Sequence, residues 1–162
     1  MLSVDLVQGA HIILAGEVHQ GLYYLEAPRD GRAVFVMPWQ GNTLVGTTET
    51  PFDGDPASAQ ARPDEISYLQ ETFRRYFPQR NVALLSSFAG VRVLPLGAGP
   101  SFRRSRETVL HPDTTRHPRL ITIYGGKLTG YRATAARVLA LLKPALPQRV
   151  QRADTASIPL TP

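Results

Sequence analysis

One stretch passes from an apolar run through a diglycine turn into a helical pattern: Arg119-Leu120-Ile121-Thr122-Ile123-Tyr124-Gly125-Gly126-Lys127-Leu128-Thr129. The apolar and β-branched residues at 119–124 are typical of a strand. From residue 129 to residue 143 apolar side chains recur at helical spacing, and Pro144 ends the pattern. The sequence therefore predicts a strand-turn-helix unit built around a Gly-Gly-Lys turn.

The predicted turn is suited to hold an electron-rich group. Its glycines let the backbone approach a ligand, the first helical N–H groups lack partners within the helix, and Lys127 adds a positive charge. It is not a Walker A loop, because no glycine stands five residues before the Gly-Lys pair, and no G-x-G-x-x-G occurs in the chain. A tight strand-to-helix turn with a solvated Lys127 is the alternative interpretation.

The region before this unit predicts an antiparallel sheet and one helix. Turn residues separate four apolar, aromatic and β-branched runs, for which a four-strand meander is the simplest interpretation: residues 6–14, 21–27, 32–39 and 43–48. Residues 51–63, rich in Pro, Gly, Asp and Ala, predict a loop. An amphipathic helix is predicted to begin at Pro63-Asp64-Glu65 and to stop before Pro78.

Two more extended segments are predicted, at residues 82–94 and 107–111. The whole pattern predicts an α+β fold, in which an antiparallel β-sheet carries one packed amphipathic helix and the strand-turn-helix unit follows. The proline-containing residues 144–162 predict a linker.

Composition excludes several classes of function. Among 162 residues, 43% are apolar and 19% are charged, which is typical of a globular protein. The absence of cysteine excludes disulfides, thiolate metal sites and cysteine nucleophiles. No His, Asp or Glu cluster has metal-ligand spacing and no G-x-S-x-G occurs, so neither a metal site nor a serine hydrolase is predicted. We find no signal-peptide pattern and no apolar run near the roughly 20 residues that span a bilayer.

The charge balance favours anionic ligands only mildly. Eighteen Lys and Arg against thirteen Asp and Glu give a net charge of +5. The densest basic run, Arg103-Arg104-Ser105-Arg106, fits a solvated loop, and no basic residues interleave with the aromatic group Tyr23, Tyr24, Phe35 and Trp39 as in a nucleic-acid platform, so no nucleic-acid partner is predicted.

Arg92 and His11 are the two isolated polar residues that could carry chemistry. Arg92 lies in an apolar extended segment, where a desolvated guanidinium needs either a protein carboxylate or a ligand anion such as phosphate. His11 lies among apolar neighbours in a predicted strand, where it is either a hydrogen-bonded packing residue or a proton acceptor.

Taken in order, seven motifs resemble the middle of the aerobic, FAD-dependent glycerol-3-phosphate dehydrogenases of the glycine oxidase and D-amino-acid oxidase superfamily. They lie between residues 6 and 143 and are Val7-Gln8-Gly9-Ala10-His11-Ile12-Ile13, Gly31-Arg32-Ala33-Val34-Phe35-Val36-Met37-Pro38-Trp39, Val45-Gly46-Thr47-Thr48-Glu49, Gly54-Asp55-Pro56, Glu65-Ile66-Ser67-Tyr68-Leu69, Phe88-Ala89-Gly90-Val91-Arg92 and Tyr124-Gly125-Gly126-Lys127-Leu128-Thr129-Gly130-Tyr131-Arg132.

The resemblance implies a flavoprotein that oxidises sn-glycerol 3-phosphate to dihydroxyacetone phosphate, with hydride transfer to FAD and electrons passed to quinone. By matching positions, it implies that Arg92 anchors the substrate, that Lys127 lies between substrate and flavin, and that His11 lies in the pocket and is our first choice for the proton acceptor. It also implies that the backbone of Gly125, Gly126, Lys127, Leu128 and Thr129 approaches the isoalloxazine ring.

The resemblance further divides the chain by role. Residues 1–118 are expected to form a substrate-binding domain, residues 119–143 to return to the FAD-binding domain, and residues 144–162 to lead towards a C-terminal domain that the chain lacks. The expected location is cytoplasmic, with possible peripheral association of the full-length enzyme at the inner membrane. Because the glycine-rich dinucleotide turn is not in the sequence, we expect the isolated chain neither to retain FAD nor to turn over substrate.

Three positions depart from the pattern of that family: Val93 replaces a proline, Gly130 replaces a second threonine, and Glu49 replaces an aspartate. A related hydroxy acid or polyol phosphate is therefore a possible substrate. Two other classes of function stay open: a binding module for phosphates or polyanions that uses Arg92, Lys127 and the basic run at 103–106, and a structural interaction domain without catalysis.

Overall fold

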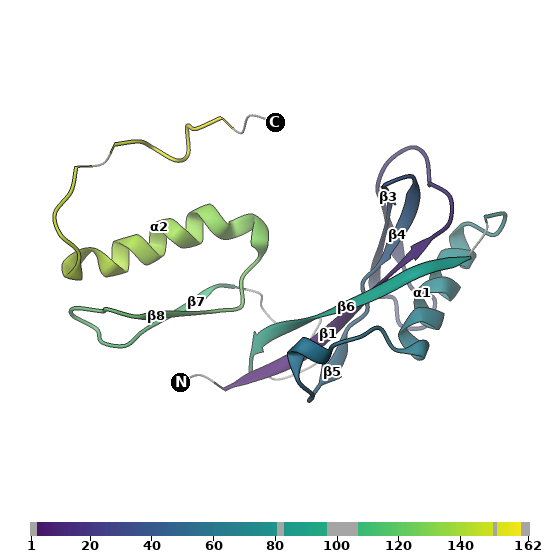
Figure 1. Cartoon of the computed structure of the whole chain (residues 1–162), viewed down its shortest axis with the longest axis horizontal. Helices are drawn as coiled ribbons and strands as arrows, with labels where there is room; N and C mark the ends of the chain where they lie inside the picture. The colour runs from purple at the N-terminus through teal and green to yellow at the C-terminus, as the bar shows by residue number, and fades with distance from the viewer. Residues whose placement is uncertain (1–2, 81–82, 97–106, 151, 160–162) are drawn as a thin grey trace. The chain divides into compact units, whose positions relative to one another are not determined.

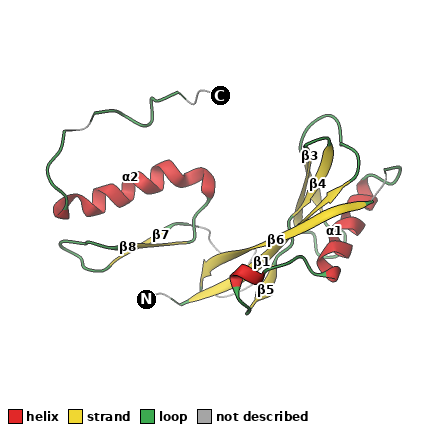
Figure 2. Ribbon diagram, viewed as in Figure 1, coloured by secondary structure: helices red, strands yellow, loops and turns green. Residues whose placement is uncertain are grey.

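The computed structural model describes residues 3–80, 83–96, 107–150 and 152–159, and these form two compact units, Met1–Arg104 and Ser105–Pro162 (Figures 1 and 2). The basic run at 103–106 lies outside the described residues. Each unit is a separate body with its own secondary structure.

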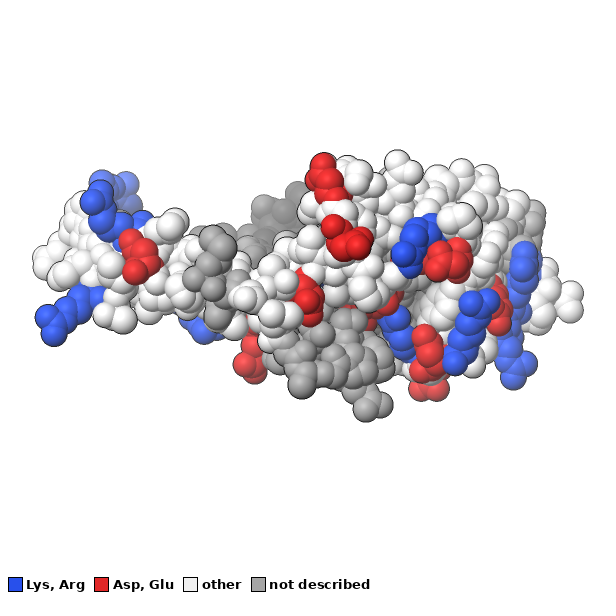
Figure 3. All heavy atoms as spheres, turned by 90° about the horizontal axis from the view of Figure 1, so that it is seen from below, with Lys and Arg blue, Asp and Glu red and all other residues white. Residues whose placement is uncertain are grey.

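On the face drawn in Figure 3, basic and acidic side chains are interspersed over the first unit, so no patch of one sign covers this face.

The first unit is built on an antiparallel sheet of six strands with the order β2-β3-β4-β1-β5, and β6 pairs with β1 on its other edge. The strands are β1 (Val4–Leu14), β2 (Tyr23–Glu26), β3 (Ala33–Trp39), β4 (Asn42–Gly46), β5 (Thr50–Phe52) and β6 (Leu84–Pro95). The predicted meander is wrong in one respect. Strands β2, β3 and β4 follow one another, but β1 pairs with β4 and not with β2.

Strand β1 lies at the centre because it is long enough to serve three partners. Its second half pairs with β4, its first half pairs with β5, and β6 runs beside it from Val4 to Leu14. Residues 51–63 are therefore not wholly a loop, since β5 and a short 3-10 helix, η1 (Pro56–Ser58), lie in this region. Asp55 accepts a hydrogen bond from the backbone N–H of Ala57 and so caps η1.

The predicted amphipathic helix is confirmed as α1 (Pro63–Tyr76), with proline in its first turn and Asp64 and Glu65 at its amino end. Alternate strand residues point to the same side, so the sheet has one apolar face, and the apolar stripe of α1 covers that face. The buried core consists of Ile12, Leu14, Val18, Leu25, Ala27, Val34, Val36, Val45, Leu69 and Phe73.

The second unit contains a hairpin and a helix. Strands β7 (Val109–Pro112) and β8 (Ile121–Tyr124) pair antiparallel, a pairing that the sequence analysis did not predict. The strand-turn-helix unit is confirmed, but a 3-10 turn, η3 (Leu128–Gly130), precedes α2 (Tyr131–Leu142), so the α-helix begins later than residue 129. A short η4 (Lys143–Ala145) ends the helical region.

Helix α2 buries none of its residues, although its sequence is largely apolar. Leu139, for example, is exposed. Within the part of the chain that the structure describes, no helix combines the length and apolarity required to cross a bilayer.

Candidate functional site

The candidate site residues His11 and Arg92 lie on one face of the first sheet. The register aligns Phe88, His11, Gly46, Phe35 and Tyr24 in a single row across five strands. Directly paired residues in an antiparallel sheet point to the same side. The neighbouring positions along the strands belong to the core beneath α1, so this row lies on the face away from that helix.

Arg92 reaches this face from β6. Its guanidinium donates to Thr47 Oγ1 at 2.9 Å and to the backbone carbonyl of Thr48 at 3.4 Å, and Nη1 lies 3.8 Å from Glu49 Oε1. The side chain is 26% exposed. Both interpretations of this arginine therefore have support, because it has protein acceptors and can still be reached by a ligand.

Glu49 joins two arginines. Its side chain is only 3% exposed, and its carboxylate accepts a hydrogen bond from Arg32 Nη2 at 3.0 Å while facing Arg92. A buried carboxylate needs such cationic partners, because an isolated charge out of water is very costly. Glu49, one of the departures noted in the sequence, thus helps to hold the guanidinium of Arg92.

Glycine at position 9 makes room for Arg92. A Cβ placed on Gly9 would collide with the guanidinium and would lie 2.6 Å from Thr47 Oγ1. The guanidinium therefore lies flat against the backbone of β1, a close approach that only glycine permits.

His11 lies flat in the same way. Its imidazole stacks on Phe88 with centroids 5.0 Å apart and planes 6° apart, and a Cβ at Gly46 would collide with the ring. Burial, and secondarily the positive charge of Arg92, lower the pKa of His11 below its ordinary value of 6.5. Its buried Nδ1 has no hydrogen-bond partner among the described residues. A neutral imidazole with an unsatisfied ring nitrogen can accept a proton.

A buried carboxylate under the site was missed by the sequence analysis as a functional residue. Glu65 accepts hydrogen bonds from Thr48 Oγ1 at 2.7 Å, Thr50 Oγ1 at 2.8 Å, Gln8 Nε2 at 2.6 Å and the backbone N–H of Arg62 at 3.0 Å. Glu65 was identified only as a helix-start residue, because its distant partners cannot be read from local spacing. It fixes the segment that carries Thr48 and Glu49.

The diglycine turn lies in the second unit. Gly125 and Gly126 have φ of +65° and +87°, and a Cβ on Gly126 would lie 2.6 Å from Thr108 Oγ1. Both requirements favour glycine at position 126. Lys127 is the N-cap residue of η3, and the side chain of the next residue, Leu128, is almost fully exposed.

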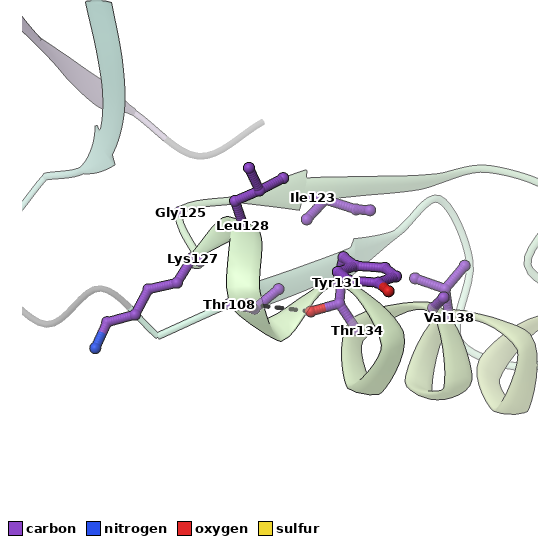
Figure 4. A pocket seen from close by; sticks show the side chains of 10 residues that line it. Thr108, Ile123, Gly125, Lys127, Leu128, Tyr131, Thr134 and Val138 are labelled. Carbon is purple, nitrogen blue, oxygen red and sulfur yellow. Dashed lines mark hydrogen bonds between the residues drawn. The ribbon is translucent and has the colours of Figure 1, made fainter. Parts of the chain in front are cut away.

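An open hollow of about 550 Å³ adjoins this turn. It lies between the hairpin and α2, and apolar side chains dominate its lining: Ile123, Leu128, Tyr131, Ala135 and Val138. Figure 4 shows Ile123, Leu128, Tyr131 and Val138 around this hollow, with Lys127 pointing away from Tyr131 and Val138. The structure thus brings His11 and Arg92 together on the first unit, and Gly125, Gly126, Lys127, Leu128 and Thr129 together on the second.

The family assignment comes from comparison with known proteins. The family model described as "FAD dependent oxidoreductase" matches residues 2–141. This chain belongs to that family. The match includes both groups of site residues, the face with His11 and Arg92 and the turn at Gly125–Gly126.

Among curated relatives, D-erythritol 1-phosphate dehydrogenase from Brucella abortus is 35% identical over 90% of this chain and 30% of its own length. Aerobic glycerol-3-phosphate dehydrogenase from Staphylococcus saprophyticus is 36% identical over 86% of this chain and 26% of its own length. The chain therefore spans less than a third of these relatives.

Among solved structures, the glycerol-3-phosphate dehydrogenase of Bacillus halodurans, complexed with FAD, is similar with a TM-score of 0.68 and 29% identity over 86% of this chain and 26% of that one. Glycine oxidase from Geobacillus kaustophilus has a TM-score of 0.55 at 19% identity over 99% of this chain and 40% of that one, which shows a shared fold. No group of three or more His, Cys, Asp or Glu side chains suited to a metal ion occurs within the described ranges.

Proposed function

We propose that this chain is the substrate-binding part of an FAD-dependent dehydrogenase that oxidises the secondary hydroxyl of sn-glycerol 3-phosphate or a closely related polyol phosphate. The observation that carries this proposal is that a partly exposed arginine and a partly buried histidine with a lowered pKa lie on one face of the sheet. The family and the polyol-phosphate relatives support the choice of substrate class.

Arg92 is proposed to bind the phosphate. A guanidinium presents a planar fork of donors that matches two phosphate oxygens. Thr47 and Glu49 hold the fork in one orientation, so little side-chain freedom is lost when the anion binds.

His11 is proposed to accept the hydroxyl proton. As the C–H bond at the carbinol carbon loses its hydride, the O–H bond must lose its proton to form the carbonyl. The lowered pKa keeps the imidazole of His11 neutral at neutral pH, and stacking on Phe88 fixes its plane.

FAD, when bound, supplies the hydride acceptor for this oxidation. The turn fits an edge of such a ring, because the positive-φ glycines expose the backbone and no side-chain hydrogen bond caps the start of η3 or α2. We propose that Gly125, Gly126, Leu128 and Thr129 offer backbone groups to the flavin and that Lys127 adds positive charge beside it.

For the whole protein, we propose the division of roles expected from the sequence: substrate binding by residues 1–118, a return to the FAD-binding domain at 119–143, and a linker at 144–162. Quinone is proposed as the electron acceptor, with cytoplasmic or peripheral membrane location. These assignments rest on the resemblance to the glycerol-3-phosphate dehydrogenases.

Flavin reduction tests the proposal directly. In the FAD-loaded enzyme that contains this chain, anaerobic sn-glycerol 3-phosphate should bleach the visible flavin band, and Arg92→Ala should raise the substrate concentration needed by about a hundredfold, since charge-assisted bonds to phosphate are strong. Arg74→Ala on the exposed side of α1 is the matched control and should leave the titration unchanged. Failure of every polyol phosphate to bleach the flavin would disprove the function.

A further inference from the structure

Gly90 lies in the middle of β6 without a local reason to be glycine. It pairs with Gly9 in a register that is regular from Val4 to Ile13 of β1, and the only irregularity in this pairing lies between Ile13 and Leu14. Gly90 is not among the residues with positive φ. Glycine inside a strand is destabilising relative to alanine, so its presence requires another cause.

Packing does not supply that cause. A Cβ built on Gly90 would meet no atom of the described residues within 4 Å, whereas a Cβ on Gly9 would collide with Arg92 and one on Gly46 would collide with His11. The space over Gly9 and over Gly46 is thus filled by candidate site residues, and the space over Gly90 is open. An interior strand glycine with open space above it is a typical place for close approach of a ligand.

The open space lies between the two functional side chains. Arg92 pairs with Val7, Gly90 with Gly9 and Phe88 with His11, so the three β6 residues point to the same face at successive steps. Two residues along a strand advance about 6.6–6.8 Å. Because the guanidinium is folded over Gly9, the imidazole of His11 lies on the order of 7 Å further along β1, a span suited to a short polyol phosphate.

We propose that the carbon chain of the substrate passes over Gly90, and that the missing side chain at this position determines how bulky a polyol phosphate the site accepts. This inference rests on the proposed function. The phosphate is held by Arg92, the carbinol faces His11, and the backbone of Gly90 forms the floor between them.

The test compares Gly90→Ala and Gly90→Val with the unaltered FAD-loaded enzyme, using sn-glycerol 3-phosphate and erythritol 1-phosphate. We expect kcat/KM to fall about tenfold or more with alanine and further with valine, because a single methyl group in a fitted site has an effect of this size. The loss should be greater for the four-carbon substrate. Competitive inhibition by inorganic phosphate, which contacts only Arg92, should keep the same inhibition constant.

The control is Ser86→Val, which adds bulk on the same face of β6 but beyond the stack of His11 on Phe88, and kcat/KM should not change. Equal kcat/KM for Gly90→Ala and the unaltered enzyme would overturn the proposal. So would a lowered melting temperature or lost FAD in both Gly90 variants, since that result would show another protein segment over Gly90. If the unaltered enzyme oxidises no polyol phosphate, the proposed function fails instead.

Discussion

At the scale of single residues, Arg92 is the position that sequence reasoning described best. An arginine in an apolar strand must have an acceptor, and the structure supplies Thr47, the carbonyl of Thr48 and Glu49. What the sequence could not supply was the way the guanidinium lies across Gly9, because that depends on the register of β6 against β1. Register follows from long-range pairing rather than from local pattern.

His11 leads to a prediction at the same scale. Replacement by glutamine removes the proposed proton acceptor and should lower kcat about 10²–10⁴-fold in the FAD-loaded enzyme. In the unaltered enzyme, burial and Arg92 lower the pKa of His11, so activity should fall only when the pH drops below 6.5 and the imidazole is protonated. The variant should lose this acid limb in a profile of kcat/KM against pH.

The matched control for His11 is His19→Gln, in the exposed segment after β1, which should retain both the rate and the acid limb. An unchanged turnover of His11→Gln at every pH would mean that another group accepts the proton. The role of Arg92 would survive that result, since it concerns binding and not proton transfer.

At the scale of elements, local pattern was sufficient for most strands and for α1 but not for their order. The meander β2-β3-β4 has tight connections, which turn residues reveal. The pairing of β1 with β4, β5 and β6 joins residues far apart in sequence, and no local signal encodes it. The β7–β8 pairing was also missed, because nothing in the local sequence of residues 107–111 indicates which strand they pair with.

Glu65 connects the start of α1 to the sheet through its buried carboxylate. Burial acts to raise its pKa, but hydrogen bonds from Thr48, the backbone of Arg62, Thr50 and Gln8 outweigh burial and lower the pKa below 4.5. The folded state therefore favours the carboxylate. This contribution to stability is fully present above pH 4.5 and is lost as the pH falls through the lower folded-state pKa.

Glu65→Gln should reduce the free energy of unfolding by roughly 2–4 kcal/mol at pH 7, because an amide NH₂ would then face donors that the carboxylate had accepted. The difference between the two proteins should shrink in urea titrations performed below pH 4.5. Glu71→Gln, which removes an exposed partner of Arg29, is the control and should cost no more than about 1 kcal/mol. A Glu65 effect as small as that of Glu71 would contradict the assigned role.

At the scale of the whole molecule, the candidate site residues lie in two compact units, and in each unit glycine permits a close backbone approach. In the first unit, Gly9 and Gly46 let Arg92 and His11 lie against the sheet. In the second, Gly125 and Gly126 shape the turn that precedes η3. The sequence predicted the turn in the second unit, because it depends on residues close in sequence. It did not predict the contacts in the first unit, where Arg92 lies over Gly9 and His11 over Gly46, because they depend on strand pairing. The face of the sheet that carries His11 and Arg92 could not be predicted as a whole, since five strands must align to form it.

The chain alone should not retain the cofactor. The turn at Gly125–Gly126 is proposed to offer backbone groups to one edge of a flavin, but the sequence has no G-x-G-x-x-G to hold the pyrophosphate at a helix N-terminus. The purified 162-residue chain, incubated with excess FAD and passed through a desalting column, should therefore emerge colourless. Flavin absorbance that travels with the protein would show that these residues bind FAD unaided. Such a result would require the apolar hollow beside Tyr131 and Val138, and not only the turn, to contact the cofactor.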